Sequence, residues 1–282
     1  ELKSFAESSM QGLSNEFDAT TYVGASEYNM QTTMASSNKG TPSIIGDFNQ
    51  KLPVDAPIDL DPRYKLTRLL GKGATGQVYL AHDNSLDEDL AIKVLDGDYV
   101  TSSYASTFKE EIRLARQVTH RNILRTFDFG TTTSGVFYIT MDYVQGYDLG
   151  KLLRLKGRLS PSLANIMIKQ ICSALLSAHE LGIIHRDLKP ENMMITQQGV
   201  LKIMDFGLAM RINDKENIGN SRMIAGTPRY MSPEQFVGGV LDNRTDIYAI
   251  GIILFQLLTG KTPFHAKSFE AMATMHQQQQ PD

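Results

Sequence analysis

Hydrophobic and polar positions follow the pattern of β-strands in four stretches of the first half of the chain. Residues 64–70 and 77–82 alternate with the period of two that places successive side chains on opposite faces of a strand. Residues 90–95 are mainly apolar with one lysine, and residues 136–144 are rich in aromatic and β-branched residues. We therefore predict a small β-rich lobe over residues 62–144.

Apolar positions with helical spacing occur between the third and fourth predicted strands and again in the second half of the chain. The first set forms one stripe that faces the interior of the lobe and comprises Phe108, Glu111, Ile112, Ala115 and Val118. Ser160 and Pro161 have the form of a helix cap with proline at the first helical position, and this helix is expected to reach about residue 181. Residues 247–258 form an apolar run too short to span a bilayer, which predicts a buried core helix. The fold class is thus expected to be α+β, with a mainly helical lobe over residues 145–282.

The composition narrows the classes of protein to which the chain can belong. With 282 residues and 41% hydrophobic content, it can bury one large core or two smaller lobes. The net charge of −3, with both signs interspersed, excludes the basic surface of a nucleic-acid binder. A single cysteine, Cys172, rules out an intramolecular disulfide and favours a cytoplasmic location. Cys172 lies in an apolar helical pattern, so we expect it to be buried.

Residues 1–61 are polar, rich in Ser, Thr, Asn, Gln and Met, and without sustained periodicity. A segment of this composition buries too little apolar surface to offset the entropy of ordering. We therefore predict an unstructured regulatory tail before the folded part of the chain.

Three polar side chains in the second half have a spacing that suits phosphate chemistry. Asp187 lies in the stretch Ile-Ile-His-Arg-Asp-Leu-Lys-Pro-Glu-Asn, Asn192 follows it by five positions, and Asp205 opens an Asp-Phe-Gly sequence thirteen positions later. A short apolar hairpin between Asn192 and Asp205 is expected to bring all three onto one platform. Such a platform can hold Mg²⁺ and orient a hydroxyl group.

These motifs resemble the catalytic loop and metal-binding motif of the eukaryotic-type (Hanks-type) serine/threonine protein kinases, most of all the bacterial members. The resemblance implies a two-lobed protein kinase fold that transfers the γ-phosphate of ATP to Ser or Thr hydroxyls of protein substrates. It assigns Asp187 as the catalytic base and Lys189 as the group that neutralises the γ-phosphate. It assigns Asn192 and Asp205 as ligands of Mg²⁺, for which Mn²⁺ is a substitute. Lys189 within Lys-Pro-Glu-Asn indicates a serine/threonine kinase instead of a tyrosine kinase.

A glycine-rich stretch lies between the first two predicted strands. The pattern alone is weak evidence, because dinucleotide sites share it, but there it opens a helix, whereas here β sequence follows. This favours a hairpin whose backbone amides approach phosphate oxygens. The residues expected to bind the nucleotide here are Gly71, Lys72, Gly73, Ala74, Gly76 and, over the adenine, Val78.

The third strand supplies Lys93, which resembles the lysine that holds the α- and β-phosphates in this family. Ala91 is expected to line the adenine pocket. Lys93 needs a carboxylate partner, and the next helix offers two candidates. Glu110 completes a capping box, so the ion pair is assigned to Glu111, which lies on the inward stripe.

The fourth strand leads to the hinge between the lobes. By resemblance, Met141 is the gatekeeper, and the backbone from Asp142 to Val144 contacts adenine. Asp148 is expected to accept hydrogen bonds from the ribose, with an exposed helix N-cap as the alternative. His185 is assigned to packing under the metal motif, and Asp246 to capping the 247–258 helix and holding the catalytic-loop backbone.

The resemblance also implies regulation. Arg186 precedes the catalytic aspartate and is expected to bind a phosphorylated residue of the activation segment, residues 205–234. Ser221 is the sole hydroxyl residue between Gly207 and Gly226, so we expect phosphorylation there, with an ordinary loop serine as the alternative. Thr227 is expected to hydrogen-bond the Asp187–Lys189 pair.

The resemblance also bears on the partners of the protein and on two alternative functions. Thr20 and Thr21 resemble a site read by phosphothreonine-binding modules, and many relatives activate as transient homodimers. A catalytically silent scaffold normally lacks one of Lys93, Asp187 or Asp205, and all three are present. A small-molecule phosphotransferase lacks the peptide-displaying segment that this chain has up to Glu234.

The match covers residues 62–282, whereas the large lobe of the family continues through several more helices. These include an arginine that pairs with the residue at Glu234. We therefore expect a C-terminally truncated fragment, and membrane anchoring by a segment after residue 282 stays open.

Overall fold

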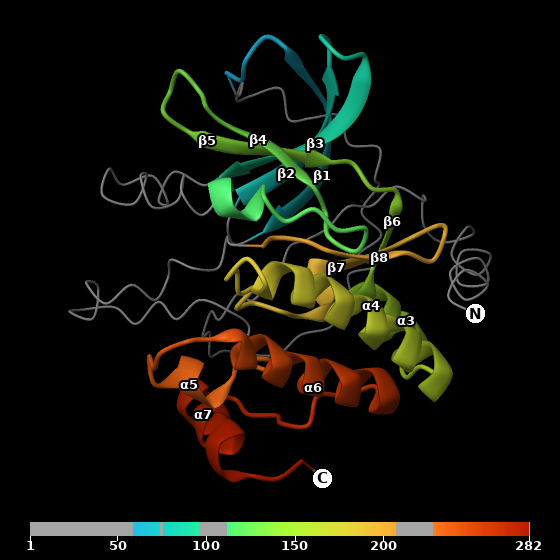
Figure 1. Ribbon diagram of the computed structural model, residues 1–282, viewed down its shortest axis with the longest axis vertical. Helices are drawn as coiled ribbons and strands as arrows, with labels where there is room; N and C mark the ends of the chain where they lie inside the picture. The colour runs from blue at the N-terminus through green and yellow to red at the C-terminus, as the bar shows by residue number, and fades with distance from the viewer. Residues whose placement is uncertain (1–58, 74–75, 96–111, 207–227, 282) are drawn as a thin grey trace, which may run out of the picture.

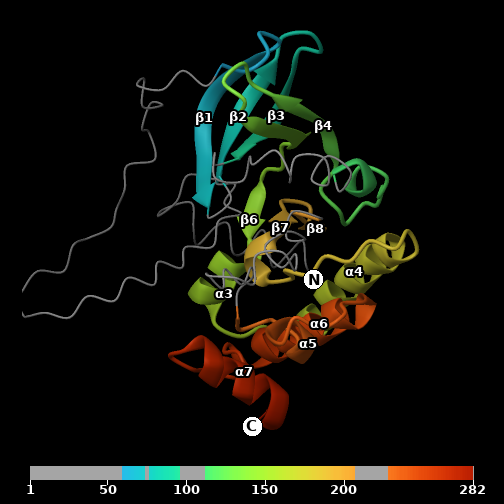
Figure 2. The ribbon, with the colours of Figure 1, turned by 90° about the vertical axis from the view of Figure 1, so that its left-hand side faces the viewer.

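Two β-sheets and a layer of helices are stacked along the long axis of the molecule (Figure 1). A computed structural model describes residues 59–73, 76–95, 112–206 and 228–281. The larger sheet lies at one end, the smaller sheet in the middle and the helices at the other end (Figures 1 and 2). This arrangement confirms the expected two-lobed α+β fold.

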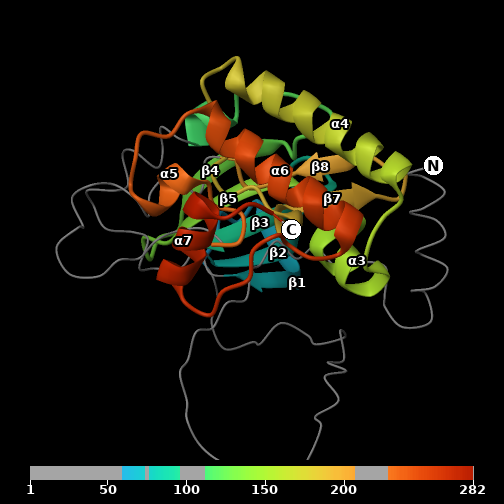
Figure 3. The same ribbon diagram turned by 90° about the horizontal axis from the view of Figure 1, so that it is seen from below.

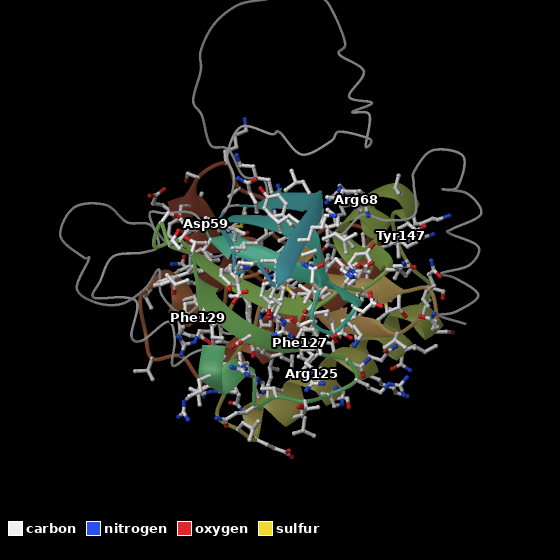
Figure 4. All side chains as sticks on the ribbon, turned by 90° about the horizontal axis from the view of Figure 1, so that it is seen from above. Asp59, Arg68, Arg125, Phe127, Phe129 and Tyr147 are labelled. Carbon is white, nitrogen blue, oxygen red and sulfur yellow. The ribbon has the colours of Figure 1, made fainter. Side chains whose placement is uncertain are left out.

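The larger sheet has five antiparallel strands in the order β1-β2-β3-β5-β4. The strands are β1 (Tyr64–Gly73), β2 (Gly76–Asp83), β3 (Glu88–Leu95), β4 (Thr126–Thr131) and β5 (Phe137–Asp142). Seen from above, Arg68 of β1 and Phe129 of β4 lie at opposite sides of this sheet, as expected for its two edge strands (Figure 4). All four predicted strand stretches are confirmed, and β5 ends at Asp142 instead of residue 144.

The alternation of side chains along strand β3 determines which face of the sheet presents Lys93. Leu90, Ile92 and Val94 pack in the outer core with Tyr79 and Tyr138. Because side chains alternate along a strand, Ala91 and Lys93 face the opposite side, and Ala91 packs there in a second core. The two-residue period therefore directs the one lysine of this strand toward the smaller sheet.

The smaller sheet connects the two ends of the molecule. It consists of β6 (Gly146–Asp148), β7 (Met193–Thr196) and β8 (Leu201–Ile203), antiparallel in that order. A bridge between Ile123 and Ile203 and the hydrogen bond from Leu124 N to Ile203 O (2.8 Å) join it to the segment that enters β4. This contact fixes the smaller sheet beneath the larger one.

The helical layer consists of α3 (Leu149–Lys156), α4 (Pro161–His179), α5 (Pro233–Phe236), α6 (Asn243–Thr259) and α7 (Phe269–Gln278). Helices α4 and α6 pack side by side beneath the smaller sheet (Figure 3). Ser160 caps α4 with Pro161 at its start, as predicted, and the Ser160 hydroxyl accepts from Leu163 N at 3.3 Å. No helix in these ranges is long and apolar enough to cross a membrane.

Two predictions about these helices are wrong. Cys172 is exposed, because the buried face of α4 runs through Met167, Ile171 and Leu175 and turns the next position outward. Helix α6 begins at Asn243 and its N-cap is Asp242, which accepts from Arg244 N at 2.9 Å. Asp246 therefore does not cap the helix. It lies within the first turn, and its carboxylate has other partners.

Helix α7 is anchored by a buried histidine. His276 is 5% exposed, contacts the rings of Phe236 and Phe264, and is hydrogen-bonded through Nδ1 to the Tyr248 hydroxyl (2.8 Å). Burial lowers the pKa of His276 to about 4. The folded protein thus holds this ring neutral at pH values at which the unfolded chain protonates it.

Acid is expected to destabilise the protein through this residue. Because the folded-state pKa lies below the unfolded value of about 6.5, the unfolded state binds more protons, and stability falls as pH decreases from about 6.5 to 4. Urea unfolding at pH 7 and pH 5 should show a loss of about 1–2 kcal/mol that is absent in a His276→Asn variant, which keeps an acceptor for Tyr248. Equal pH dependence of the two proteins would contradict the assignment.

Candidate active site

An ion pair joins strand β3 of the larger sheet to the segment that follows β8. Lys93 of β3 donates from Nζ to Asp205 Oδ1 at 3.0 Å, and the lysine side chain is only 3% exposed. Asp205 follows β8 with φ of 60°, a left-handed conformation that is uncommon for a residue with a side chain. The structure thus joins the two residues to which the sequence assigned phosphate and metal binding.

Three residues of the catalytic loop form a second connected group. Lys189 Nζ donates to Asp187 Oδ2 at 2.7 Å, and Asn192 Nδ2 donates to Asp187 O at 2.8 Å and to Asp187 Oδ2 at 3.2 Å. Asn192 ends the 3-10 turn Pro190–Asn192, which leads directly into β7. Asp187 and Asn192, two of the three residues predicted to share a platform, are therefore in contact, and the Asp187 carboxylate is held by two donors.

Asn192 and Asp205 lie on neighbouring segments, because Met204 N donates to Asn192 O at 2.9 Å. The amide nitrogen of Asn192 is engaged with Asp187, so its amide oxygen is the atom that suits a cation. Together with the Asp205 carboxylate it makes a pair of hard oxygen ligands, the type that Mg²⁺ prefers. Within the described ranges no group of three His, Cys, Asp or Glu side chains is placed to hold a metal.

The backbone of the catalytic loop is held by a buried carboxylate. Asp246, 0% exposed, accepts from His185 N and Arg186 N at 2.9 Å each and from His179 Nε2 at 2.8 Å. His185 is buried as predicted, donates from Nε2 to Met204 O at 2.7 Å and contacts the Phe206 ring. The expected hold of Asp246 on this loop is confirmed.

The glycine-rich stretch forms the tip of the β1–β2 hairpin. Gly71 pairs with Val78, Lys72 with Gln77, and Gly73 with Gly76. Gly76 has φ of 140°, and a Cβ there would overlap the backbone of β3, so this position requires glycine. The continuation as strand β2 confirms the hairpin interpretation.

The residues assigned to the adenine pack in one apolar cluster that spans both sheets. Val78, Ala91, Met141 and Val144 come from the larger sheet and the hinge, and Ala91 lies opposite Met141 in the strand pairing. Met194 of β7 joins them from below and is fully buried. Sequence reasoning missed Met194, because β7 is apolar at three of its four positions and no period distinguishes its two faces.

The hinge backbone is partly engaged already. Asp142 N donates to Arg125 O at 2.9 Å, so this N–H group serves the sheet. Any backbone contact of Asp142 with a base must therefore use its carbonyl oxygen.

Asp148 is the N-cap of α3, where its Oδ1 accepts from Lys151 N at 2.7 Å. This is the alternative that the sequence left open, but the cap is buried, at 2% exposed, instead of exposed. Burial, together with the nearby charge of Glu191, raises the pKa of Asp148 to about 7. The carboxyl group is thus partly protonated at neutral pH.

An Asp148→Asn variant is expected to be more stable than the parent protein at pH 8 but not at pH 4. The folded-state pKa lies above the unfolded value of about 3.9, so the parent loses stability as pH rises from about 4 to 7. Asparagine caps as well as aspartate does and carries no charge. Urea unfolding should show a gain of about 1–3 kcal/mol at pH 8, and the same difference at both pH values would contradict the assignment.

Several predicted residues lie outside the described ranges. These are Ala74, Glu111, Ser221, Thr227 and the tail residues Thr20 and Thr21. The end of the expected activation segment is described, and there Glu234 Oε1 accepts from the Thr245 hydroxyl at 2.9 Å.

Comparison with known proteins gives a consistent result. The protein kinase domain family matches residues 64–281. Serine/threonine-protein kinase PrkC of Bacillus subtilis is 39% identical over 217 residues, which is 77% of this chain and 33% of that protein. Serine/threonine-protein kinase pkn3 of Myxococcus xanthus is 38% identical over 78% of this chain and 42% of its own length. Serine/threonine-protein kinase PknB of Mycobacterium leprae is 37% identical over 80% of this chain and 37% of its own length.

The chain therefore spans between a third and about two fifths of the length of these relatives. The family works with ATP and a divalent metal ion. The family match, the two-sheet architecture and the assembled Lys93–Asp205 and Asp187–Lys189–Asn192 groups agree. The chain belongs to the protein kinase domain family, of the Hanks type.

Proposed function

We propose that this protein is a serine/threonine protein kinase, which transfers the γ-phosphate of ATP to Ser or Thr hydroxyls of protein substrates. The observation that carries the proposal is the contact between Lys93 and Asp205, at 3.0 Å, beside the Asp187 group. Lys93 belongs to β3, and Asp205 follows β8. They meet at the place where we expect the triphosphate of ATP, between the apolar cluster that would hold adenine and the acceptor hydroxyl. The apolar cluster around Ala91 and Met141 supports adenine binding above it.

Asp187 orients the acceptor hydroxyl and takes up its proton late in the reaction, since phosphoryl transfer is largely dissociative. Its carboxylate is kept in place by Lys189 and Asn192. Lys189 would offset the negative charge of the transferred group, and Lys93 would hold the α- and β-phosphates. Nucleotide contacts would come from Gly71, Lys72, Gly73, Ala74, Gly76, Val78 and Val144.

Asn192 and Asp205 would hold Mg²⁺, or Mn²⁺ as its substitute, and the ion when bound neutralises charge on the β- and γ-phosphates. The Asn192 amide oxygen and the Asp205 carboxylate are donors of the hard oxygen type that Mg²⁺ prefers.

Regulation is proposed to act through the activation segment and the tail. Phospho-Ser221 would pair with Arg186, and Thr227 would bridge the catalytic residues. In the active arrangement, Lys93 would form its ion pair with Glu111 instead of with Asp205. The tail, residues 1–61, would carry phosphothreonine at Thr20 or Thr21 for a binding module. We also propose that the protein forms transient homodimers and that its kinase domain is located in the cytoplasm.

Peptide mass spectrometry of the full-length protein after incubation with Mg-ATP and a generic protein substrate tests this function. Phosphoserine or phosphothreonine on the substrate and on Ser221 is expected. Phosphate on the substrate but not on Ser221 would support the kinase activity and contradict the proposed regulation through Ser221. ATP binding without phosphate on any protein would contradict the kinase activity and favour a catalytically silent scaffold.

A further inference from the structure

The backbone of Arg186 is constrained on both sides. Its φ of 67° is in the left-handed region, which costs on the order of 1–3 kcal/mol for such a residue and persists only when its surroundings hold it. Asp246 accepts its N–H at 2.9 Å. Its carbonyl oxygen accepts from Gln235 Nε2 at 2.8 Å, a contact between residues 49 positions apart.

The orientation of the Gln235 amide follows from its other partners. Gln235 lies on α5, is 5% exposed, and accepts from Ser232 N at 2.9 Å and from the Ser232 hydroxyl at 3.3 Å. Both of these contacts use Oε1, so the amide nitrogen must face Arg186. The side chain therefore bridges the start of α5 and the catalytic loop with both ends of its amide.

The carbonyl that Gln235 holds belongs to the peptide unit between Arg186 and Asp187. Because that unit is planar, fixing the Arg186 carbonyl fixes the direction in which the chain enters Asp187. The Asp187 carboxylate has its own partners, Lys189 and Asn192, but these approach it from the C-terminal side of the loop. Gln235 and Asp246 are the contacts that define the N-terminal side.

We propose that Gln235 is a positioning residue for Asp187, which couples the α5 segment to the catalytic aspartate. The inference rests on the proposed kinase function for its kinetic consequence. Without this contact, the left-handed conformation of Arg186 loses one of the two backbone hydrogen bonds that the described residues give it, and Asp187 spends less time in the reactive orientation. ATP binding should be unaffected, because the hydrogen bonds described for the Gln235 side chain go to Ser232 and to the Arg186 carbonyl and not to Lys93.

The test is a Gln235→Glu variant of the full-length protein. Glutamate keeps the size of the side chain and an acceptor for Ser232 N, but it places a carboxylate oxygen against the Arg186 carbonyl. We expect kcat to fall about tenfold, with the KM for ATP changed less than about twofold. We also expect faster hydrogen exchange in the peptide that covers residues 183–189. All measurements are made well below the Tm of each variant.

Gln256→Glu is the matched control. Gln256 is a glutamine of intermediate exposure, its Oε1 accepts from the Tyr230 hydroxyl at 2.8 Å, and it has no hydrogen bond to the catalytic loop among the contacts described. It should leave kcat and the exchange rate unchanged. If Gln235→Glu fails to fold, Gln235→Met, which is uncharged and of similar length, carries the same expectation.

Three results would overturn the proposal. These are a kcat equal to that of the parent protein, a KM for ATP that rises in step with the loss of kcat, or unchanged exchange over residues 183–189. If the parent protein itself transfers no phosphate, the proposed function fails, and the exchange measurement still decides whether Gln235 restrains the loop.

Discussion

An Asp187→Asn variant is expected to bind ATP with the affinity of the parent protein and to lose about 10²–10⁴-fold in kcat. Asparagine fills the same volume but cannot take up the proton of the acceptor hydroxyl. Lys189 Nζ at 2.7 Å and Asn192 Nδ2 at 3.2 Å both donate to the same carboxylate oxygen, Oδ2, so an asparagine with its amide oxygen in that place keeps both contacts. The loss is therefore expected to fall on the uptake of the proton.

The measurement is phosphate transfer to a protein substrate, with nucleotide affinity determined separately by displacement of a fluorescent ATP analogue. Asp128→Asn is a suitable control, because Asp128 is exposed on β4, where its side chain forms a surface ion pair with Arg116 and accepts from Phe129 N at 2.9 Å. A loss of ATP affinity that matched the loss of kcat would show that Asp187 supports the nucleotide site instead of the acceptor. Retention of more than about a tenth of the activity would argue against a role as base.

An Asp246→Asn variant is expected to lose about 3 kcal/mol or more of stability, with a large loss of activity in the remaining folded protein. The fully buried carboxylate accepts three hydrogen bonds, two of them from catalytic-loop backbone amides. An asparagine side chain has one acceptor oxygen, so its amide nitrogen would face a buried donor. The loop would then have to move or leave a donor unsatisfied.

Asp242→Asn on the same helix is the matched control for this prediction. Asp242 is the N-cap of α6 and pairs with the exposed Arg244, and asparagine is an equally good N-cap. Urea unfolding of both variants, followed by kcat at a temperature at which each is folded, separates the effects on stability and on catalysis. If Asp246→Asn unfolded at the same urea concentration as Asp242→Asn, the proposed hold on the catalytic loop would be wrong.

The sequence predicted most of the candidate site because its signals are local. The spacing of Asp187, Asn192 and Asp205 spans one loop and one hairpin, and the hairpin forms as β7 and β8. The period of β3 places Lys93 on the inner face. Its described partner is Asp205, while the expected partner, Glu111, lies outside the described residues.

The errors came from features that depend on neighbours far away in the chain. A helical period shows that α4 has a buried face, but only packing against α6 and the smaller sheet decides that Cys172 lies off that face. A carboxylate at the start of an apolar run resembles a cap, and three distant donors turn Asp246 inward instead. Asp148 is a cap, as its local sequence allows, but its burial and raised pKa depend on what packs around α3.

By itself, then, the sequence determined the family, four strands of the larger sheet and the helices α4 and α6, and it supplied the candidate site residues, because each is encoded in a short window by period, cap or motif. Only the tertiary structure decided which atoms hold those side chains in position. Met194 beneath the adenine cluster, Asp246 beneath the loop and Gln235 against the Arg186 carbonyl come from segments remote in sequence. Their types are ordinary for a strand or helix, and a directional hydrogen bond or a packing contact across the core leaves no periodic trace in the chain.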